Sequence, residues 1–287
     1  MIVIVDSGST KCDWLTVDIN GNHLLEKIKT KGLNPAILQE AELYNIINEQ
    51  PDLNKHKLDV THVYFYGAGC GTEKPRILLK QVLASIFSNA LIEVKEDTYA
   101  AIRATVNKPN EAAVVCILGT GSNCSYFDGS HVHQRVNSLG YSLMDDASGN
   151  YYGKQLIRDY YFYHMPETLR TAFAETYNMD TDFIKHNLYK QPNPNAYLAS
   201  FAEFMFLYKE NVYIKNLIKK GLRLFSENMI LQFKEEIKTV PVHFAGSISY
   251  FSKDEILEIA EEYHYKVGNI VKRPIDGLVN YHTNKNE

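Results

Sequence analysis

The chain has 287 residues, of which 45% are hydrophobic and 22% charged, and its formal net charge is -4. This length exceeds the ~100–200 residues typical of one domain, so two lobes are expected. No basic block suggests a nucleic-acid surface, and no apolar run is long enough for a signal peptide or a membrane span. We therefore expect a cytoplasmic protein with no nucleic-acid and no membrane partner.

The four cysteines are scattered without CxxC spacing, at Cys12, Cys70, Cys116 and Cys124. This pattern indicates neither a zinc site nor a disulfide framework. We expect reduced and mostly buried thiols.

The N-terminal segment begins with an apolar strand, residues 2–5, which ends at Asp6 and runs into Ser7-Gly8-Ser9-Thr10-Lys11. A carboxylate facing glycines and hydroxyls suits a hydrated magnesium ion beside a nucleotide phosphate. The alternative is an Asx turn that holds the loop. A strand over residues 12–18 then leads through Asn20-Gly21, a hairpin signal, to a third strand over 23–29.

A glycine cluster, Gly67-Ala68-Gly69-Cys70-Gly71-Thr72, separates a predicted strand over 62–66 from a helix that extends to Phe87. Its position invites a dinucleotide-binding interpretation. Because Thr72 stands where the third glycine of GxGxxG belongs, a nicotinamide or flavin site is not supported.

Asp97 follows the next predicted strand, residues 90–94, and precedes a helix over 99–104. Aspartate is a good helix N-cap, which is one interpretation of this position. The other is a general base at a domain junction.

The central segment runs from an apolar strand over 114–118 into Gly119-Thr120-Gly121-Ser122-Asn123-Cys124. Glycines let backbone N–H groups approach an anion, which favours a phosphate loop. The alternative is a tight hairpin to a returning strand over 125–127. The similar composition of Ser7 to Lys11 favours the phosphate loop.

The second half continues with an acidic, glycine-rich loop over 140–149, in which Asp145 could accept hydrogen bonds from a polyol. Helices are expected to about residue 160, over 198–208 and over 214–237. A strand over 240–244 then ends in Ala245-Gly246-Ser247, the third strand-to-glycine turn, before a helix over 253–263.

The ordered set of these three turns resembles the phosphate-1, phosphate-2 and adenosine motifs of the actin-like (ASKHA) sugar-kinase superfamily. The chain is most similar to N-acetylglucosamine kinases of the BadF/BadG/BcrA/BcrD ATPase group. The resemblance implies an α/β, two-lobed actin-like ATPase (ribonuclease H-like) fold with a nucleotide cleft between the lobes. It places the N-terminal lobe at 1–106 and the C-terminal lobe, with helical insertions, at 107–287.

The resemblance also implies ATP and Mg²⁺ as cofactors and a role for each matching residue. Asp97 would be the catalytic base, and Asp6 would contact the metal. The nucleotide would be held by Gly8, Ser9, Thr10, Lys11, Gly119, Thr120, Gly121, Gly246 and Ser247. The sugar would be held by Asn34, Asn123, Gly140, Tyr141 and Asp145.

Two features depart from the family pattern. The loop that usually reads Gly-Asp-Glu-Gly-Ser is Met144-Asp145-Asp146-Ala147-Ser148, and Ser7 stands where glycine is common. The first change bears on which sugar is bound.

The expected activity is phosphorylation of an amino sugar, N-acetylglucosamine first, with N-acetylmuramic acid or glucosamine as related substrates. Proteins of this kind commonly form homodimers. Alternatives are an activator-type ATPase, which needs paired cysteines for an iron–sulfur cluster, and a non-catalytic sugar sensor on a kinase fold.

Overall fold

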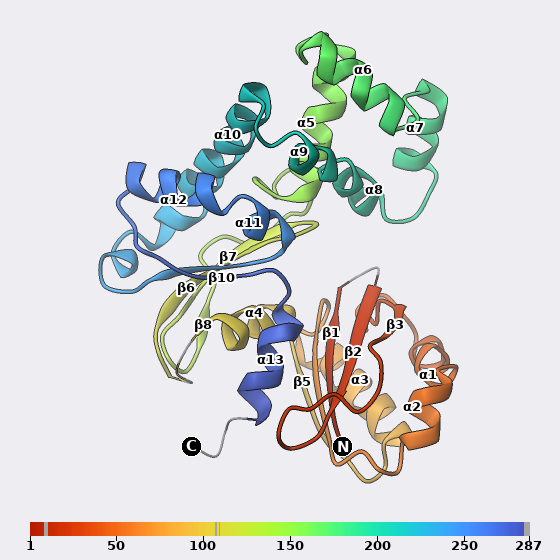
Figure 1. Cartoon of the computed structure of the whole chain (residues 1–287). Helices are drawn as coiled ribbons and strands as arrows, with labels where there is room; N and C mark the ends of the chain where they lie inside the picture. The colour runs from red at the N-terminus through yellow and green to blue at the C-terminus, as the bar shows by residue number, and fades with distance from the viewer. Residues whose placement is uncertain (9–10, 107, 109, 284–287) are drawn as a thin grey trace. The chain divides into compact units, whose positions relative to one another are not determined.

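The computed structural model describes residues 1–8, 11–106, 108 and 110–283 (Figure 1). Ser9 and Thr10, two of the predicted phosphate-binding residues, lie outside this range. The chain forms two compact units, one from Met1–Ala104 together with the C-terminal segment from Arg273, the other from Thr105–Lys272. The expected lobes, 1–106 and 107–287, differ from these units chiefly in the placement of the C-terminal segment.

The first unit contains a five-stranded sheet in the order β3-β2-β1-β4-β5. Its strands are β1 (Ile2–Ser7), β2 (Lys11–Val17), β3 (Ile28–Lys31), β4 (His62–Gly67) and β5 (Leu91–Lys95). β1 is antiparallel to β2 and parallel to β4, and β4 is parallel to β5. The carboxyl ends of β1, β4 and β5 therefore share one edge of the sheet.

The predicted turn at Asn20-Gly21 is present, because Gly21 has a φ of +84° and Asp18 donates its N–H to the Asn22 carbonyl at 3.0 Å. The predicted third strand over 23–29 is wrong in its range. The Asp18 carboxylate accepts hydrogen bonds from the N–H groups of Asn20 and Asn22 and closes the turn locally. His23 makes only an isolated bridge, and regular pairing begins at Ile28.

Helices cover both faces of this sheet: α1 (Glu40–Asn48), α2 (Pro51–His56), α3 (Glu73–Ile86), α4 (Asp97–Thr105) and α13 (Pro274–Thr283). Successive side chains of β1 point to opposite faces of the sheet, as in any β-strand. Val3 and Val5 join a core with α1 and α3, whereas Ile2 and Ile4 pack with Leu278 of α13. The C-terminal helix thus completes the first unit.

The second unit contains a five-stranded sheet in the order β10-β9-β6-β7-β8. Its strands are β6 (Ala113–Leu118), β7 (Ser122–Phe127), β8 (Val132–His133), β9 (Val242–Ala245) and β10 (Val267–Val271). β6 and β7 are antiparallel and closed by Gly119–Gly121, so the hairpin interpretation of the central segment is confirmed. A hairpin turn does not exclude phosphate binding, because backbone N–H groups of a glycine-rich turn can still face an anion.

The helices of the second unit are α5 (Gly149–Tyr161), α6 (Glu167–Thr176), α7 (Thr181–Tyr189), α8 (Pro194–Ser200), α9 (Glu203–Leu207), α10 (Val212–Asn228), α11 (Ser247–Phe251) and α12 (Lys253–Glu262). The predicted helix over 214–237 is wrong at its end, because α10 stops at Asn228. Two 3₁₀ turns follow, Ile230–Phe233 and Glu236–Lys238. Their Ile230, Phe233 and Ile237 remain buried, which explains the helix-like apolar spacing. No described helix is both long and apolar enough to cross a membrane.

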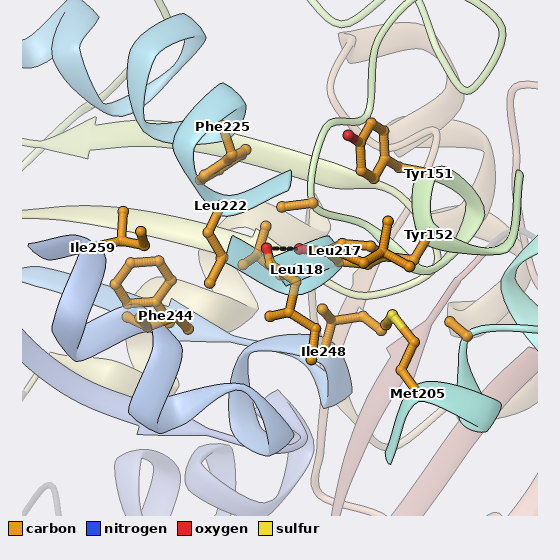
Figure 2. Close-up of a cluster of buried hydrophobic side chains, with 14 of the residues drawn as sticks. Leu118, Tyr151, Tyr152, Met205, Leu217, Leu222, Phe225, Phe244, Ile248 and Ile259 are labelled. Atoms are coloured by element: carbon orange, nitrogen blue, oxygen red, sulfur yellow. Dashed lines mark hydrogen bonds between the residues drawn. The ribbon is translucent and has the colours of Figure 1, made fainter. Parts of the chain in front are cut away.

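The core of the second unit joins the sheet to α5 and α10 (Figure 2). Leu118 of β6 and Phe244 of β9 meet Tyr152 of α5 and Phe225 of α10. The Tyr152 hydroxyl is buried and donates to the Ile218 carbonyl at 2.8 Å. The strand that leads into the glycine turn and the helix that follows the acidic loop therefore share one packed core.

Candidate active site

The loop after β1 is braced by Ser7, whose side chain is buried. Its hydroxyl accepts from the Leu33 N–H at 2.8 Å and donates to the Gly8 carbonyl at 3.2 Å. The Gly8 N–H donates to the Lys11 carbonyl at 2.9 Å. The serine that departs from the family pattern thus ties the predicted phosphate loop to the segment that carries Asn34.

Asp6, at the end of β1, is partly buried among other carboxylates. Burial raises its pKa to about 7, repulsion from Asp97 and Asp13 contributes, and Lys27 and Lys11 oppose the rise. Lys27 forms an ion pair with Asp13. Among the described residues no group of three or more His, Cys, Asp or Glu side chains could hold a metal ion. A cation at Asp6 would therefore depend on phosphate oxygens and water for its other ligands.

Asp97 is the first residue of α4 and follows β5 at the same sheet edge as Asp6. Its side chain is accessible to solvent, but the protein packed around the carboxylate raises its pKa. Hydrogen bonds from the N–H groups of Asp97 and Thr98 partly offset that rise. Burial raises the pKa of Glu96 and of Cys70, and the negative charge of Asp97 adds to both shifts. Asp97 therefore lies at the start of a helix and also presents a solvent-accessible carboxylate of raised pKa.

Asn34 lies buried in the loop before α1, and its Oδ1 accepts from the Ala36 N–H at 3.0 Å. Gly69 of the glycine cluster packs directly against it. A Cβ added at Gly69 would lie 1.9 Å from this oxygen, and the φ of Gly69 is +80°. Sequence reasoning rejected the cluster as a dinucleotide motif and missed this contact, although the dense glycines signalled a close approach of backbone to another group.

The turn Gly119-Thr120-Gly121 is held from two sides in the second unit. Within it, the Gly119 N–H donates to the Gly121 carbonyl at 3.0 Å. Gly246 has a φ of +124°, and a Cβ added there would lie 2.1 Å from the Leu118 carbonyl oxygen. The predicted adenosine motif, Gly246 with Ser247, therefore lies against the backbone at the start of the predicted phosphate turn.

The acidic loop holds the turn from the other side. The Gly149 N–H donates to the Gly119 carbonyl at 2.7 Å, and the Asn150 N–H donates to the Thr120 carbonyl at 3.0 Å. Asp145 has a φ of +68°, in the left-handed region. Its Oδ2 accepts from Asn150 Nδ2 at 2.8 Å. Sequence reasoning found Asp145 but missed Asn150, because nothing local connects that residue to a turn thirty positions earlier.

A pocket of about 300 Å³ opens beside this loop and includes Asp145 in its lining, together with Ser122, Val136, Ser138, Leu143, Met144, Asp146, Asn228 and Met229. Asp146, which replaces the family glutamate, accepts from Asn228 Nδ2 at 2.8 Å. The other predicted sugar-binding residues of this unit, Asn123, Gly140 and Tyr141, do not line the pocket. Asn123 Oδ1 accepts from the Cys124 N–H, and the Tyr141 carbonyl accepts from Lys154 Nζ.

Comparison with protein-family models and with curated proteins finds no match. Among solved structures, the putative N-acetylglucosamine kinase from Porphyromonas gingivalis is 31% identical, with all of both chains covered and a TM-score of 0.90. The chain belongs to the N-acetylglucosamine kinase family.

Members of this family have the actin-like sugar-kinase fold, and more distant structures agree with that assignment. The putative N-acetylglucosamine kinase from Chromobacterium violaceum is 14% identical over 98% of both chains, with a TM-score of 0.66. A ROK family glucokinase from Streptomyces griseus, in complex with glucose and AMPPNP, is 14% identical over 98% of this chain and 97% of its own, with a TM-score of 0.59. The predicted family and fold class are confirmed.

Proposed function

We propose that this kinase transfers the γ-phosphate of ATP to an amino sugar and forms the 6-phosphate of N-acetylglucosamine. The observation that carries the proposal is the shared sheet edge of the first unit. There Asp97, an accessible carboxylate of raised pKa, stands on the same edge as the Asp6 to Lys11 loop. A general base and a phosphate-binding loop are the two components that phosphoryl transfer to a hydroxyl requires.

In the proposed mechanism the Asp97 carboxylate accepts the proton of the sugar 6-hydroxyl as that oxygen attacks the γ-phosphorus. A raised pKa suits this role, because a stronger base accepts the proton more readily. The N–H groups of Asp97 and Thr98 at the start of α4 donate to the carboxylate and favour its ionised form. The transferred phosphoryl group passes to the sugar oxygen, and ADP leaves.

Each unit has its own set of proposed nucleotide-binding residues. Gly8 and the ammonium of Lys11, with Ser9 and Thr10, would hold the β- and γ-phosphates. Backbone groups of the Gly119-Thr120-Gly121 turn would bind phosphate from the second unit. Gly246 and Ser247 would line the adenosine portion. Close packing of Gly246 against the Leu118 carbonyl supports the assignment of the last two sets of residues to one binding surface of the second unit.

Asp6 is the residue that we propose to contact Mg²⁺, and its surroundings fit that ion. It is a hard oxygen ligand whose pKa is raised chiefly by burial, with a further contribution from repulsion by the nearby carboxylates of Asp97 and Asp13. When bound, magnesium would neutralise charge on the phosphates and relieve this repulsion. Lys11 and Lys27 supply positive charge to the same region.

For the sugar we propose contacts from Asn34, Asn123, Gly140, Tyr141 and Asp145. The pocket beside Asp145 supports a neutral sugar over an acidic one. Its lining includes two carboxylates, Asp145 and Asp146, and no Lys or Arg. A carboxylated substituent such as the lactyl group of N-acetylmuramic acid would be repelled there, whereas an acetamido group is uncharged. The apolar part of the lining, with Met144 and Met229, suits a methyl group.

The scattered cysteines argue against an activator-type ATPase. The iron–sulfur cluster of such a protein needs a paired cysteine motif, whereas Cys12, Cys70, Cys116 and Cys124 show no CxxC spacing. The expected homodimer stays a prediction, which light scattering of the purified protein would test.

The decisive experiment measures ADP release with N-acetylglucosamine, N-acetylmuramic acid, glucosamine and glucose. Asp97→Asn should lower kcat by ~10²- to 10⁴-fold, the usual contribution of a general base. Glu96→Gln is the matched control, because burial raises the pKa of this adjacent carboxylate too. It should retain most activity. Full turnover by Asp97→Asn would reject the base, and absence of sugar-dependent ADP release would reject the function.

A further inference from the structure

Asn150, the second residue of α5, lies between the glycine turn and Asp145 and is fully buried. Its backbone N–H and its Nδ2 both donate to the Thr120 carbonyl, at 3.0 and 2.7 Å. The same Nδ2 donates to Asp145 Oδ2 at 2.8 Å. One side chain therefore joins the predicted phosphate turn to a predicted sugar ligand.

This bridge determines which oxygen of Asp145 is free. Oδ2 is engaged by Asn150 and also lies against the turn, since a Cβ added at Gly121 would be 2.9 Å from it. Among the described residues no hydrogen bond engages Asp145 Oδ1. The carboxylate is thus fixed by one oxygen, and the other remains available as an acceptor.

The backbone around Asp145 makes such fixing necessary. Asp145 and Ala147 both have positive φ angles, +68° and +56°. Non-glycine residues adopt this conformation only at a cost, so surrounding contacts must maintain it. Asn150 contributes such a contact and projects from a helix anchored in the core by Tyr152.

We propose that Asn150 is a positioning residue that couples the phosphate turn to the orientation of Asp145 for sugar binding. This inference rests on the proposed function, because it takes Asp145 as a sugar ligand. Movement of the turn on nucleotide binding would pass through the Thr120 carbonyl to Asn150 and to Asp145. Nucleotide and sugar binding would then depend on one another through this side chain.

Asn150→Asp provides the sharpest test, since it keeps the shape but replaces the Nδ2 donor with an oxygen. At pH 8 the new carboxylate would repel Asp145 Oδ2, and KM for the sugar should rise tenfold or more. At lower pH the pair can share a proton, and the resulting O–H restores a donor. The ratio of variant to wild-type kcat/KM for the sugar should therefore increase at least fivefold from pH 8 to pH 6.

Ser148→Ala is the matched structural control. The Ser148 hydroxyl caps α5 by accepting from the Tyr151 N–H at 3.2 Å, and among the described residues it makes no hydrogen bond with Asp145. This variant should lower the melting temperature and leave KM for the sugar within about twofold at every pH. A pH-independent activity ratio for Asn150→Asp, or a KM change matched by Ser148→Ala, would overturn the proposal.

A second measurement needs no substrate and separates the failure of this inference from failure of the proposed function. Urea unfolding of Asp145→Ala, Asn150→Ala and the double variant forms a double-mutant cycle. Each variant should lower the folding equilibrium constant by some factor. If the two side chains are coupled, the factor for the double variant should be at least fivefold smaller than the product of the factors for the two single variants. Independent losses would show that the two side chains are not coupled, whatever sugar the enzyme uses.

Discussion

Asp6 allows a quantitative test of the electrostatics at the end of β1. Its pKa is raised from the ordinary value of 3.8 to about 7, chiefly by burial and then by Asp97 and Asp13. A carboxyl group whose pKa is higher in the folded protein binds more protons there than in the unfolded chain. The free energy of unfolding must therefore decrease as pH rises between these two values. Asp6→Asn removes this dependence, because the amide does not ionise.

The size of this effect on the free energy of unfolding follows from the difference between the two pKa values of Asp6. At about 1.36 kcal/mol per pH unit, the rise corresponds to an upper limit of roughly 4 kcal/mol. The side chain is only partly buried, so water screens the charge and reduces the effect. We expect Asp6→Asn to stabilise the ligand-free protein by about 1–2 kcal/mol at pH 8 and to have little effect below pH 4.

Urea unfolding of wild type and Asp6→Asn at half-unit steps from pH 4 to pH 8 measures this difference. Asp18→Asn is the control, because hydrogen bonds from Asn22 lower the pKa of that exposed carboxylate. Its titration lies below 3.8, so its effect should stay constant over the same range. A difference between wild type and Asp6→Asn that does not grow with pH would refute the reasoning.

Two further predictions concern packing. Gly246→Ala would place a Cβ 2.1 Å from the Leu118 carbonyl, so we expect a loss of more than about 3 kcal/mol in unfolding free energy. Gly140 is the control, because it also has a positive φ but no atom lies within 4 Å of an added Cβ. Gly140→Ala should cost about 1–2 kcal/mol. Equal losses for the Gly246 and Gly140 variants would exclude the clash as the cause. The thiols should react with Ellman's reagent at pH 8 only after unfolding, since all are buried and burial raises the pKa of Cys70 to about 12. Rapid labelling of the native protein would contradict this burial.

The three strand-to-glycine turns could be predicted because their signals are local. Each is an apolar run followed by glycine, and both the strand and the turn reflect the chemistry of adjacent residues. The same holds for Asp97, which lies between a strand and a helix. Whether these residues contact ligands remains a prediction.

Contacts between distant segments could not be predicted. The apolar residues of α13 can be recognised in the sequence, but their spacing does not indicate which of the two sheets the helix covers. Asn150 is an ordinary residue near a helix start until the structure places it beside Thr120. Likewise, Gly69 has its close neighbour in Asn34, which lies 35 positions earlier in the chain.

The placement of α13 has a consequence for how this protein is made. Ile2, Ile4, Leu15 and Val17 on one face of the first sheet are covered by residues from 275 onward. During synthesis these strands emerge before the second unit, whereas their covering helix emerges only after it. The whole second unit is translated in between, and can fold while the earlier strands still expose apolar surface. Biogenesis of this kinase therefore includes an interval of exposed apolar surface that ends only when α13 has emerged and packed on the first sheet.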